Sequence, residues 1–101
     1  MSVVQVRLAG TDCYEGTGGD PLLPEPFSDS VGLTECKEAC LGESQCVAIV
    51  RKRSEGIGKG ACYRRTRVRL EECDQDSEWD LYQFDNSTTG RSSNISCTFP
   101  L

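Results

Sequence analysis

The hydrophobic positions of the chain recur with two different periods, which predict one helix among several short strands. The helix is predicted over residues 33–41, where Gly32 is expected to cap the start and Gly42 to end the last turn. Glu35 places an acidic side chain in the first turn, three residues after the cap. The side chains expected on one face recur at helical spacing: Leu33, Cys36, Ala39 and Cys40.

Four segments carry the patterns of β-strands. Residues 3–8 (VVQVRL) alternate loosely, whereas residues 46–50 (CVAIV) contain no polar side chain, which predicts a buried central strand. Residues 62–70 (CYRRTRVRL) alternate again, and a final strand is predicted over residues 79–84 (WDLYQF). One helix among about four short strands indicates an α+β fold.

The segments between these elements carry turn and loop signals. Residues 51–60 (RKRSEGIGKG) predict a charged, glycine-rich hairpin loop. Three prolines within residues 20–27 predict an extended, irregular connection, and residues 74–78 predict an acidic turn. The Gly-Thr-Gly-Gly run that begins at Gly16 lacks the patterns of known phosphate-binding loops, so a turn is the better interpretation.

The composition describes a small domain with little material for a core. Of the 101 residues, 37% are hydrophobic and 7% are aromatic, and the hydrophobic count includes seven cysteines. A chain with so thin a core usually needs covalent or metal staples. We expect residues 1–85 to form one domain, and residues 86–101, which are rich in Ser, Thr and Asn, to form a polar tail.

Charge and one missing residue type exclude several functions. The net charge of −5 argues against a protein that binds nucleic acids by neutralising phosphates. The sequence contains no His, which removes the usual general base and the Ser–His and Cys–His pairs, so we do not expect an enzyme. No stretch approaches the roughly eighteen apolar residues of a membrane helix, so no direct membrane span is expected.

The seven cysteines favour a disulfide framework. A zinc knuckle or a thioredoxin-like site would need two cysteines separated by two residues, but the closest pair, Cys36 and Cys40, is separated by three. We therefore expect neither a metal nor a cofactor. Disulfides indicate an oxidising compartment, which would make the chain secreted, attached to the cell surface or resident in an organelle lumen.

An odd number of cysteines leaves at least one without an internal partner, and Cys97 in the polar tail is the natural candidate. This cysteine would be either a free thiol or a bridge to another chain. The tail also contains two N-glycosylation patterns, which begin at Asn86 and Asn94. The sequence leaves their occupancy open.

The spacing of the central cysteines resembles that of PAN/apple domains. The pattern is two cysteines on a helix, a third on the following aliphatic strand and a fourth on the next strand: Cys36, Cys40, Cys46 and Cys62. PAN-like domains of protists and algae are similar in three further features of this chain: the run Cys13-Tyr14-Glu15-Gly16, the run Cys62-Tyr63-Arg64, and Cys73 before a late aromatic strand. The resemblance covers residues 13–84, which is most of the chain.

This resemblance implies a small antiparallel sheet that cradles one helix and is stapled by disulfides. The bridges it implies are Cys36–Cys62, Cys40–Cys46 and Cys13–Cys73. PAN/apple domains are modules that bind proteins and carbohydrates, so the resemblance also implies a binding function.

A cluster of cationic residues is the candidate ligand-binding site. Alternation places one tyrosine and three arginines on the same strand face: Tyr63, Arg65, Arg67 and Arg69. A second cationic run lies one hairpin away in the sequence: Arg51, Lys52 and Arg53. Arginine offers a planar fork to oxyanions, so this patch suits sulfated glycans, acidic peptides or carboxylates. The alternative is a solvated strand face whose arginines pair with Glu71, Glu72 or the acidic turn.

Two other groups of residues are better explained by structure than by chemistry. The carboxylates of residues 71–80 do not match a calcium-binding loop, because no glycine follows at the required place. Trp79, Tyr82 and Phe84 could form a ligand platform, but at this spacing they are more simply core residues.

The residues and the resemblance together predict a non-catalytic recognition or adhesion module that binds a protein or an acidic carbohydrate. The alternative is a structural accessory subunit of a larger lumenal or extracellular assembly, which in an alga could be a photosynthetic complex. In that case the proline-rich loop, the polar tail and Cys97 would contact the partner chains.

Overall fold

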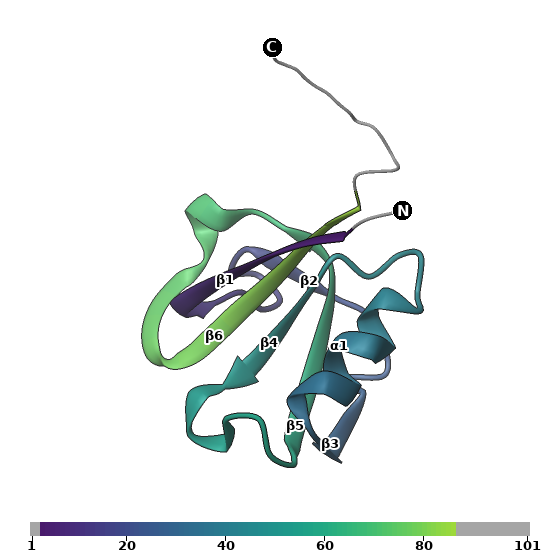
Figure 1. The fold of residues 1–101 in the computed structure, drawn as a ribbon. Helices are drawn as coiled ribbons and strands as arrows, with labels where there is room; N and C mark the ends of the chain where they lie inside the picture. Colours follow the sequence, from purple (N-terminus) through teal and green to yellow (C-terminus); the bar gives the residue numbers. More distant parts are fainter. Residues whose placement is uncertain (1–2, 87–101) are drawn as a thin grey trace.

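Six strands and one helix make up the part of the chain that the computed structural model describes, residues 3–86 (Figure 1). In chain order they are β1 (Val3–Asp12), β2 (Gly19–Pro21), β3 (Ser28–Val31), α1 (Leu33–Leu41), β4 (Ala48–Lys52), β5 (Gly60–Val68) and β6 (Asp74–Asn86). Two short 3₁₀ turns, η1 (Arg53–Glu55) and η2 (Leu70–Glu72), follow β4 and β5. The elements form an α+β fold, as the sequence predicts.

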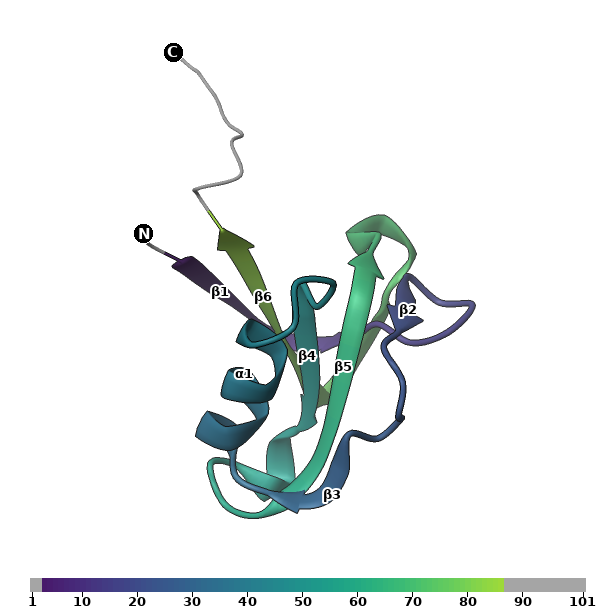
Figure 2. The same cartoon turned by 90° about the vertical axis from the view of Figure 1, so that its right-hand side faces the viewer.

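The strands form one antiparallel sheet in the order β1-β6-β4-β5-β2, and β3 pairs with the first half of β5. β4 lies between β5 and β6, which confirms the predicted central strand and the predicted hairpin. β1 and β6 form the longest pair, which runs from Val3 opposite Asn86 to Asp12 opposite Asp74. Figure 2 shows α1 on one side of this sheet.

The helix begins and ends where the local signals predict. The Gly32 N–H donates to Glu35 Oε1 at 2.9 Å, and the Gly42 N–H donates to the carbonyl of Glu38 at 2.9 Å. Its buried side chains, Cys36 and Cys40, pack on one face of the sheet. The cluster that they form contains Cys36, Cys40, Ile49, Cys62 and Tyr82.

The opposite face of the sheet has a second, smaller core. Its buried members are Cys13, Ala48, Val50 and Leu81. The chain around Gly18 packs closely against Cys73 here. A Cβ at Gly18 would lie 2.6 Å from Cys73 Sγ, and its φ of +84° lies in the left-handed region, so only glycine fits at this position.

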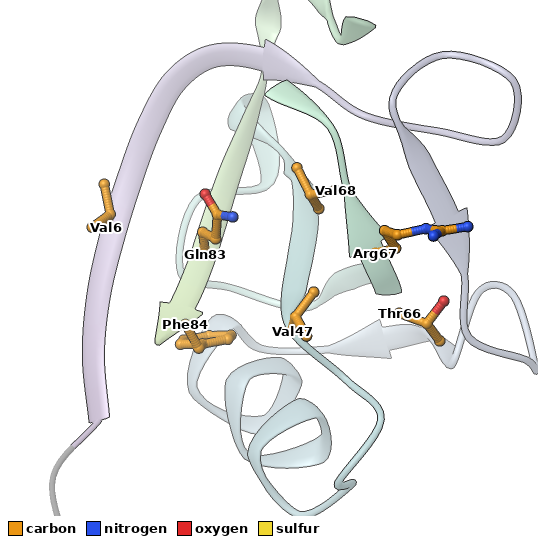
Figure 3. A pocket seen from close by; sticks show the side chains of 7 residues that line it. All are labelled: Val6, Val47, Thr66, Arg67, Val68, Gln83 and Phe84. Atoms are coloured by element: carbon orange, nitrogen blue, oxygen red, sulfur yellow. The ribbon is translucent and has the colours of Figure 1, made fainter. Parts of the chain in front are cut away.

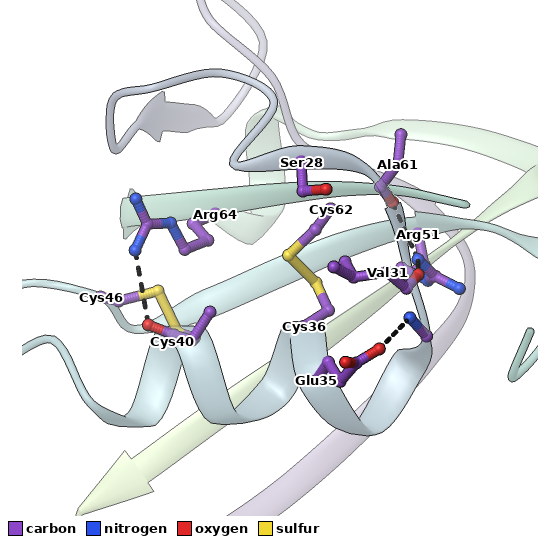
Figure 4. The surroundings of a disulfide bond; sticks show 12 residues. Ser28, Val31, Glu35, Cys36, Cys40, Cys46, Arg51, Ala61, Cys62 and Arg64 are labelled. Atoms are coloured by element: carbon purple, nitrogen blue, oxygen red, sulfur yellow. Dashed lines mark hydrogen bonds between the residues drawn. A yellow bond between two sulfur atoms is a disulfide. The ribbon is translucent and has the colours of Figure 1, made fainter. Parts of the chain in front are cut away.

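Three disulfides staple the two cores, and they are the three that the sequence resemblance implied. Cys36–Cys62 and Cys40–Cys46 tie α1 to the sheet side of the first core, as Figure 4 shows. Cys13–Cys73 closes the second core and joins residues 60 positions apart. Because disulfides persist where thiols are not kept reduced, these bridges indicate an oxidising compartment.

Several predicted strand boundaries are wrong: β1 runs on to Asp12, β4 begins at Ala48, and β5 covers Gly60–Val68 where residues 62–70 were predicted. Long-range pairing also extends two further strand ends. β4 continues to Lys52, where the sequence predicts a loop from Arg51 onward. The acidic turn predicted over residues 74–78 is instead the start of β6, since Gln75 pairs with Thr11 across the sheet.

The predicted polar tail lies almost wholly outside the described residues. Asn86 is the last residue of β6 and lies opposite Val3, whereas Asn94 and Cys97 fall outside the described part of the chain. Within residues 3–86, no helix is long and apolar enough to cross a membrane.

Candidate functional site

The predicted arginine patch does not form one surface, because Arg65 is buried. Its side chain is only 2% exposed. Its Nε donates to the Cys13 carbonyl at 2.6 Å, and its Nη1 donates to Glu25 Oε2 at 2.6 Å. Arg65 therefore joins β5 to residues before and after β2 inside the fold, and its prediction as a surface contact is wrong.

Arg67 and Arg69 are paired with carboxylates of the same chain. Arg67 Nε donates to Asp20 Oδ2 at 3.1 Å, while Arg69 donates to Asp20 Oδ1 at 3.4 Å and to Glu72 Oε1 at 3.2 Å. The hydrogen bonds from Arg69 and Arg67 lower the pKa of Asp20. Pairing with Glu72 is the outcome expected of a solvated strand face, and Asp20 is a partner that the sequence did not indicate.

The hollow beside Arg67 has a mixed apolar and polar lining. Its volume is about 510 Å³, and it is lined by Val6, Val47, Thr66, Arg67, Val68, Gln83 and Phe84. Figure 3 shows the guanidinium of Arg67 pointing away from the valines and toward β2. The strand arginines therefore present no joint fork to a ligand here.

Arg51 is buried as well, and it organises the loops on the helix side of the sheet. It is 2% exposed, and its two terminal nitrogens donate to four backbone carbonyls. The acceptors belong to Val31, Gly56, Gly58 and Ala61. Figure 4 shows this guanidinium next to Val31 and Ala61. The prediction that Arg51 lies in an exposed loop is wrong, because these carbonyls satisfy a charged group inside the fold.

Arg51, Lys52 and Arg53 nevertheless meet at one hollow of about 280 Å³, which we call the arginine pocket. Its lining residues come from β1, the start of α1, the β4–β5 connection and β6: Arg7, Leu33, Arg51, Lys52, Arg53, Gly56, Ile57, Asp80 and Tyr82. Four of these residues are cationic and one is a carboxylate. The pocket therefore carries an excess of positive charge on an acidic protein.

Asp80 holds two of the cations of the arginine pocket in place. It accepts hydrogen bonds from Arg7 Nη2 at 2.9 Å, from Arg53 Nη2 at 2.8 Å and from the Gly10 N–H at 3.1 Å. Burial alone would raise the pKa of Asp80, but these three hydrogen bonds outweigh it and lower the pKa to about 2. Arg7 and Arg53 keep about half of their side-chain surface exposed, so their outer donors face solvent.

A second hollow, which we call the aromatic pocket, lies on the other face of the sheet. Its volume is about 210 Å³, and it is lined by Asp12, Tyr14, Glu25, Val50, Tyr63, Arg65 and Trp79. The rings of Tyr63 and Trp79 meet edge to face with centroids 5.8 Å apart. Tyr63, predicted as a contact residue, lies here and not with Arg67 or Arg69.

Carboxylates surround the aromatic pocket. The hydroxyl of Tyr14 donates to Asp74 Oδ2 at 2.5 Å, and this hydrogen bond raises the pKa of Tyr14. Burial raises the pKa of Asp12, and the charges of Asp76 and Asp74 add to that effect while Arg65 opposes it.

Sequence reasoning missed the residues that long-range pairing brings to each pocket. Arg7 and Asp80 lie 73 positions apart, and only the pairing of β1 with β6 joins them. The available signal was a single charged residue, Asp80, inside the largely apolar and aromatic run from Trp79 to Phe84. Of the aromatics in that run, Tyr82 is buried in the core, whereas Trp79 lines the aromatic pocket.

The described residues contain no group of three or more His, Cys, Asp or Glu side chains arranged to hold a metal ion. Comparisons of the chain with protein-family models, curated proteins and solved structures found no match. The resemblance to PAN/apple domains therefore stays a prediction.

Proposed function

We propose that this chain is a non-catalytic recognition module that binds acidic ligands through the arginine pocket. The observation that carries the proposal is the charge of that pocket, whose lining contains four cationic residues and one carboxylate. The ligand supplies an oxyanion, which is either a carboxylate of a protein or an acid group of a carbohydrate. The module works in an oxidising compartment, as part of a secreted, cell-surface or lumenal protein.

The side chains of the arginine pocket suit binding better than catalysis. Asp80 is held ionised by Arg7 and Arg53, and a carboxyl with a pKa of about 2 is a poor proton donor or acceptor near neutral pH. Arginine forks, by contrast, bind carboxylate and sulfate oxygens with two parallel hydrogen bonds.

The apolar part of the rim favours an acidic group that is attached to a larger ligand. Ile57 is 83% exposed and lines the pocket together with Leu33 and Tyr82. An exposed isoleucine beside cationic side chains can pack against an apolar part of a protein or against the ring face of a sugar.

The test is an NMR titration of the isotope-labelled, oxidised domain with two probes, a sulfated disaccharide and an Asp/Glu-rich peptide. Each bound probe is expected to shift the amide signals of Lys52, Arg53 and Ile57, and affinity is expected to fall as salt is raised. The probe that binds more tightly identifies the ligand class.

Arg53→Gln removes a half-exposed cation of the arginine pocket, and Lys59→Gln removes an exposed one from the same β4–β5 connection outside the pocket. Affinity is expected to fall about threefold in Arg53→Gln and to stay near the original value in Lys59→Gln. Equal losses in the two variants, or no binding of either probe, would overturn the proposal. In the latter case a structural role in a larger assembly would take its place.

A further inference from the structure

We infer that the aromatic pocket is a second binding site, which takes a methylated ammonium group. The inference is independent of the arginine pocket, which lies on the other face of the sheet. It rests on three aromatic side chains, an unpaired carboxylate and a hollow of limited size, all within residues 12–79.

The aromatic side chains form walls at different angles. The rings of Tyr63 and Trp79 make an interplanar angle of 66°, and Tyr14 stands at the rim with 38% of its surface exposed. Val50 also lines the hollow and is fully buried. A cation that enters such a corner contacts the negative faces of aromatic rings, which is how proteins hold quaternary ammonium ligands.

The fold already places one cation near one of these rings. The guanidinium carbon of Arg65 lies 5.8 Å from the centroid of the Tyr63 ring. Its charge is balanced by Glu25, at 2.6 Å from Nη1. The Arg65–Glu25 pair is therefore neutral as a unit, so the second lining carboxylate leaves the pocket with one net negative charge.

That other carboxylate is Asp12. Its side chain is half-buried, and it takes part in none of the side-chain hydrogen bonds or ion pairs found between described residues. The nearby charges of Asp74 and Asp76 make the surroundings more negative. A ligand cation beside Trp79 would supply the missing counter-charge to Asp12.

Size and hydration select the kind of cation. A volume of about 210 Å³ is below the roughly 300 Å³ at which pockets for whole drug-sized molecules begin, so the hollow fits one group of a ligand. Methylated ammonium groups lose hydration more readily than a primary ammonium and pack well on aromatic faces. The group could come from a small solute such as choline or from a methylated lysine of a protein.

The chain provides its own probe for the test, because Trp79 is its only tryptophan. Titration of the oxidised domain with choline is expected to give a saturable change in tryptophan fluorescence. The matched probe 3,3-dimethylbutan-1-ol has the same shape without the charge and is expected to give no saturable change. An equal response to both probes would overturn the cation site and leave an apolar hollow.

Two variants test whether the carboxylate of Asp12 is the group that attracts choline. Asp12→Asn is expected to weaken choline binding about fivefold, whereas Glu15→Gln, which removes an exposed carboxylate outside the pocket, is expected to leave it unchanged. Equal effects would mean that only the overall negative charge attracts choline, and the site would be rejected.

The source of the group is tested with a short peptide that carries trimethyl-lysine and with the same peptide carrying unmodified lysine. Tighter binding of the methylated peptide than of choline identifies a protein ligand, and the reverse identifies a small solute. No saturable change with choline or with the methylated peptide would refute the inference. Because the acidic probes bind elsewhere, such a failure leaves the test of the arginine pocket unaffected.

Discussion

The arginine pocket and the aromatic pocket lie on opposite faces of one sheet, yet neighbouring residues line them. In β4, Val50 lines the aromatic pocket and Arg51 the arginine pocket; in β6, Trp79 and Asp80 divide in the same way. Successive side chains of a strand point to opposite faces, so two adjacent positions can serve hollows of opposite charge. The thickness of the sheet thus separates the proposed anion site from the proposed cation site.

The two faces also differ in what holds them together. The helix face has two disulfides of short sequence separation and a buried arginine that binds loop carbonyls. The opposite face depends on a single bridge, Cys13–Cys73, between segments far apart in the chain. We therefore expect the aromatic pocket to be the more easily lost of the two, and the following changes test this contrast.

The largest effect is expected from the Cys13→Ala/Cys73→Ala double variant. A bridge that closes about 60 residues lowers the conformational entropy of the unfolded chain and thereby stabilises the fold by about 4 kcal/mol. The short loop of Cys40–Cys46 contributes about 2 kcal/mol in the same way. Urea unfolding measures both losses. An equal or larger loss in the Cys40→Ala/Cys46→Ala variant would contradict the contrast between the faces.

Replacement of Arg51 by methionine is expected to destabilise the fold by about 3 kcal/mol, because four backbone carbonyls lose their donor and become buried without a partner. Thermal unfolding measures the loss. The loss should be accompanied by weaker hydrogen-exchange protection around Gly58 and Ala61, and unchanged protection there would argue that the loops hold their shape without Arg51.

Asp80→Asn is expected to cost about 2 kcal/mol at neutral pH. The pKa of Asp80 is lowered from 3.8 to about 2, so the ionised carboxylate stabilises the fold above about pH 4, and this stability is lost as the pH falls toward 2. Urea unfolding between pH 7 and 2 should therefore show a shallower decline in the variant. The acidic probes should bind Asp80→Asn more tightly, and weaker binding would count against the arginine pocket as an anion site.

The smallest effect is expected from Arg67→Gln. Its ion pair with Asp20 is exposed, and Arg69 still neutralises that carboxylate. We expect a loss below about 1 kcal/mol and no change in the binding of the acidic probes. A marked loss of binding would restore the strand arginines as a contact surface.

The helix could be predicted from sequence because its signals are local. Gly32, Glu35 and Gly42 lie within one turn of its ends, and the buried cysteines share one face. The ends of β4 and β6 could not be predicted in this way, because they are set by pairing with distant strands.

The candidate site was predicted only in part for a related reason. Alternation correctly places Tyr63 and Arg65 on one face of β5, but it does not say that the chain near Cys13 and Glu25 will cover that face. Arg53 remains at a hollow because it pairs with Asp80, which Arg7 also contacts. Asp80 could not be identified as this shared carboxylate from the sequence, because only the pairing of β1 with β6 brings it next to Arg7.

The pairing of β1 with β6 also decides how the domain responds to mechanical force. Val3 and Asn86 lie opposite each other, so tension applied to both ends of residues 3–86 peels the two strands apart one pair at a time. The peeling reaches Asp12 and Asp74 and stops there, because the next residue on each strand belongs to the Cys13–Cys73 bridge. Stretching would thus pull Arg7 away from Asp80 and open the arginine pocket, while the covalently closed remainder of the domain stays intact.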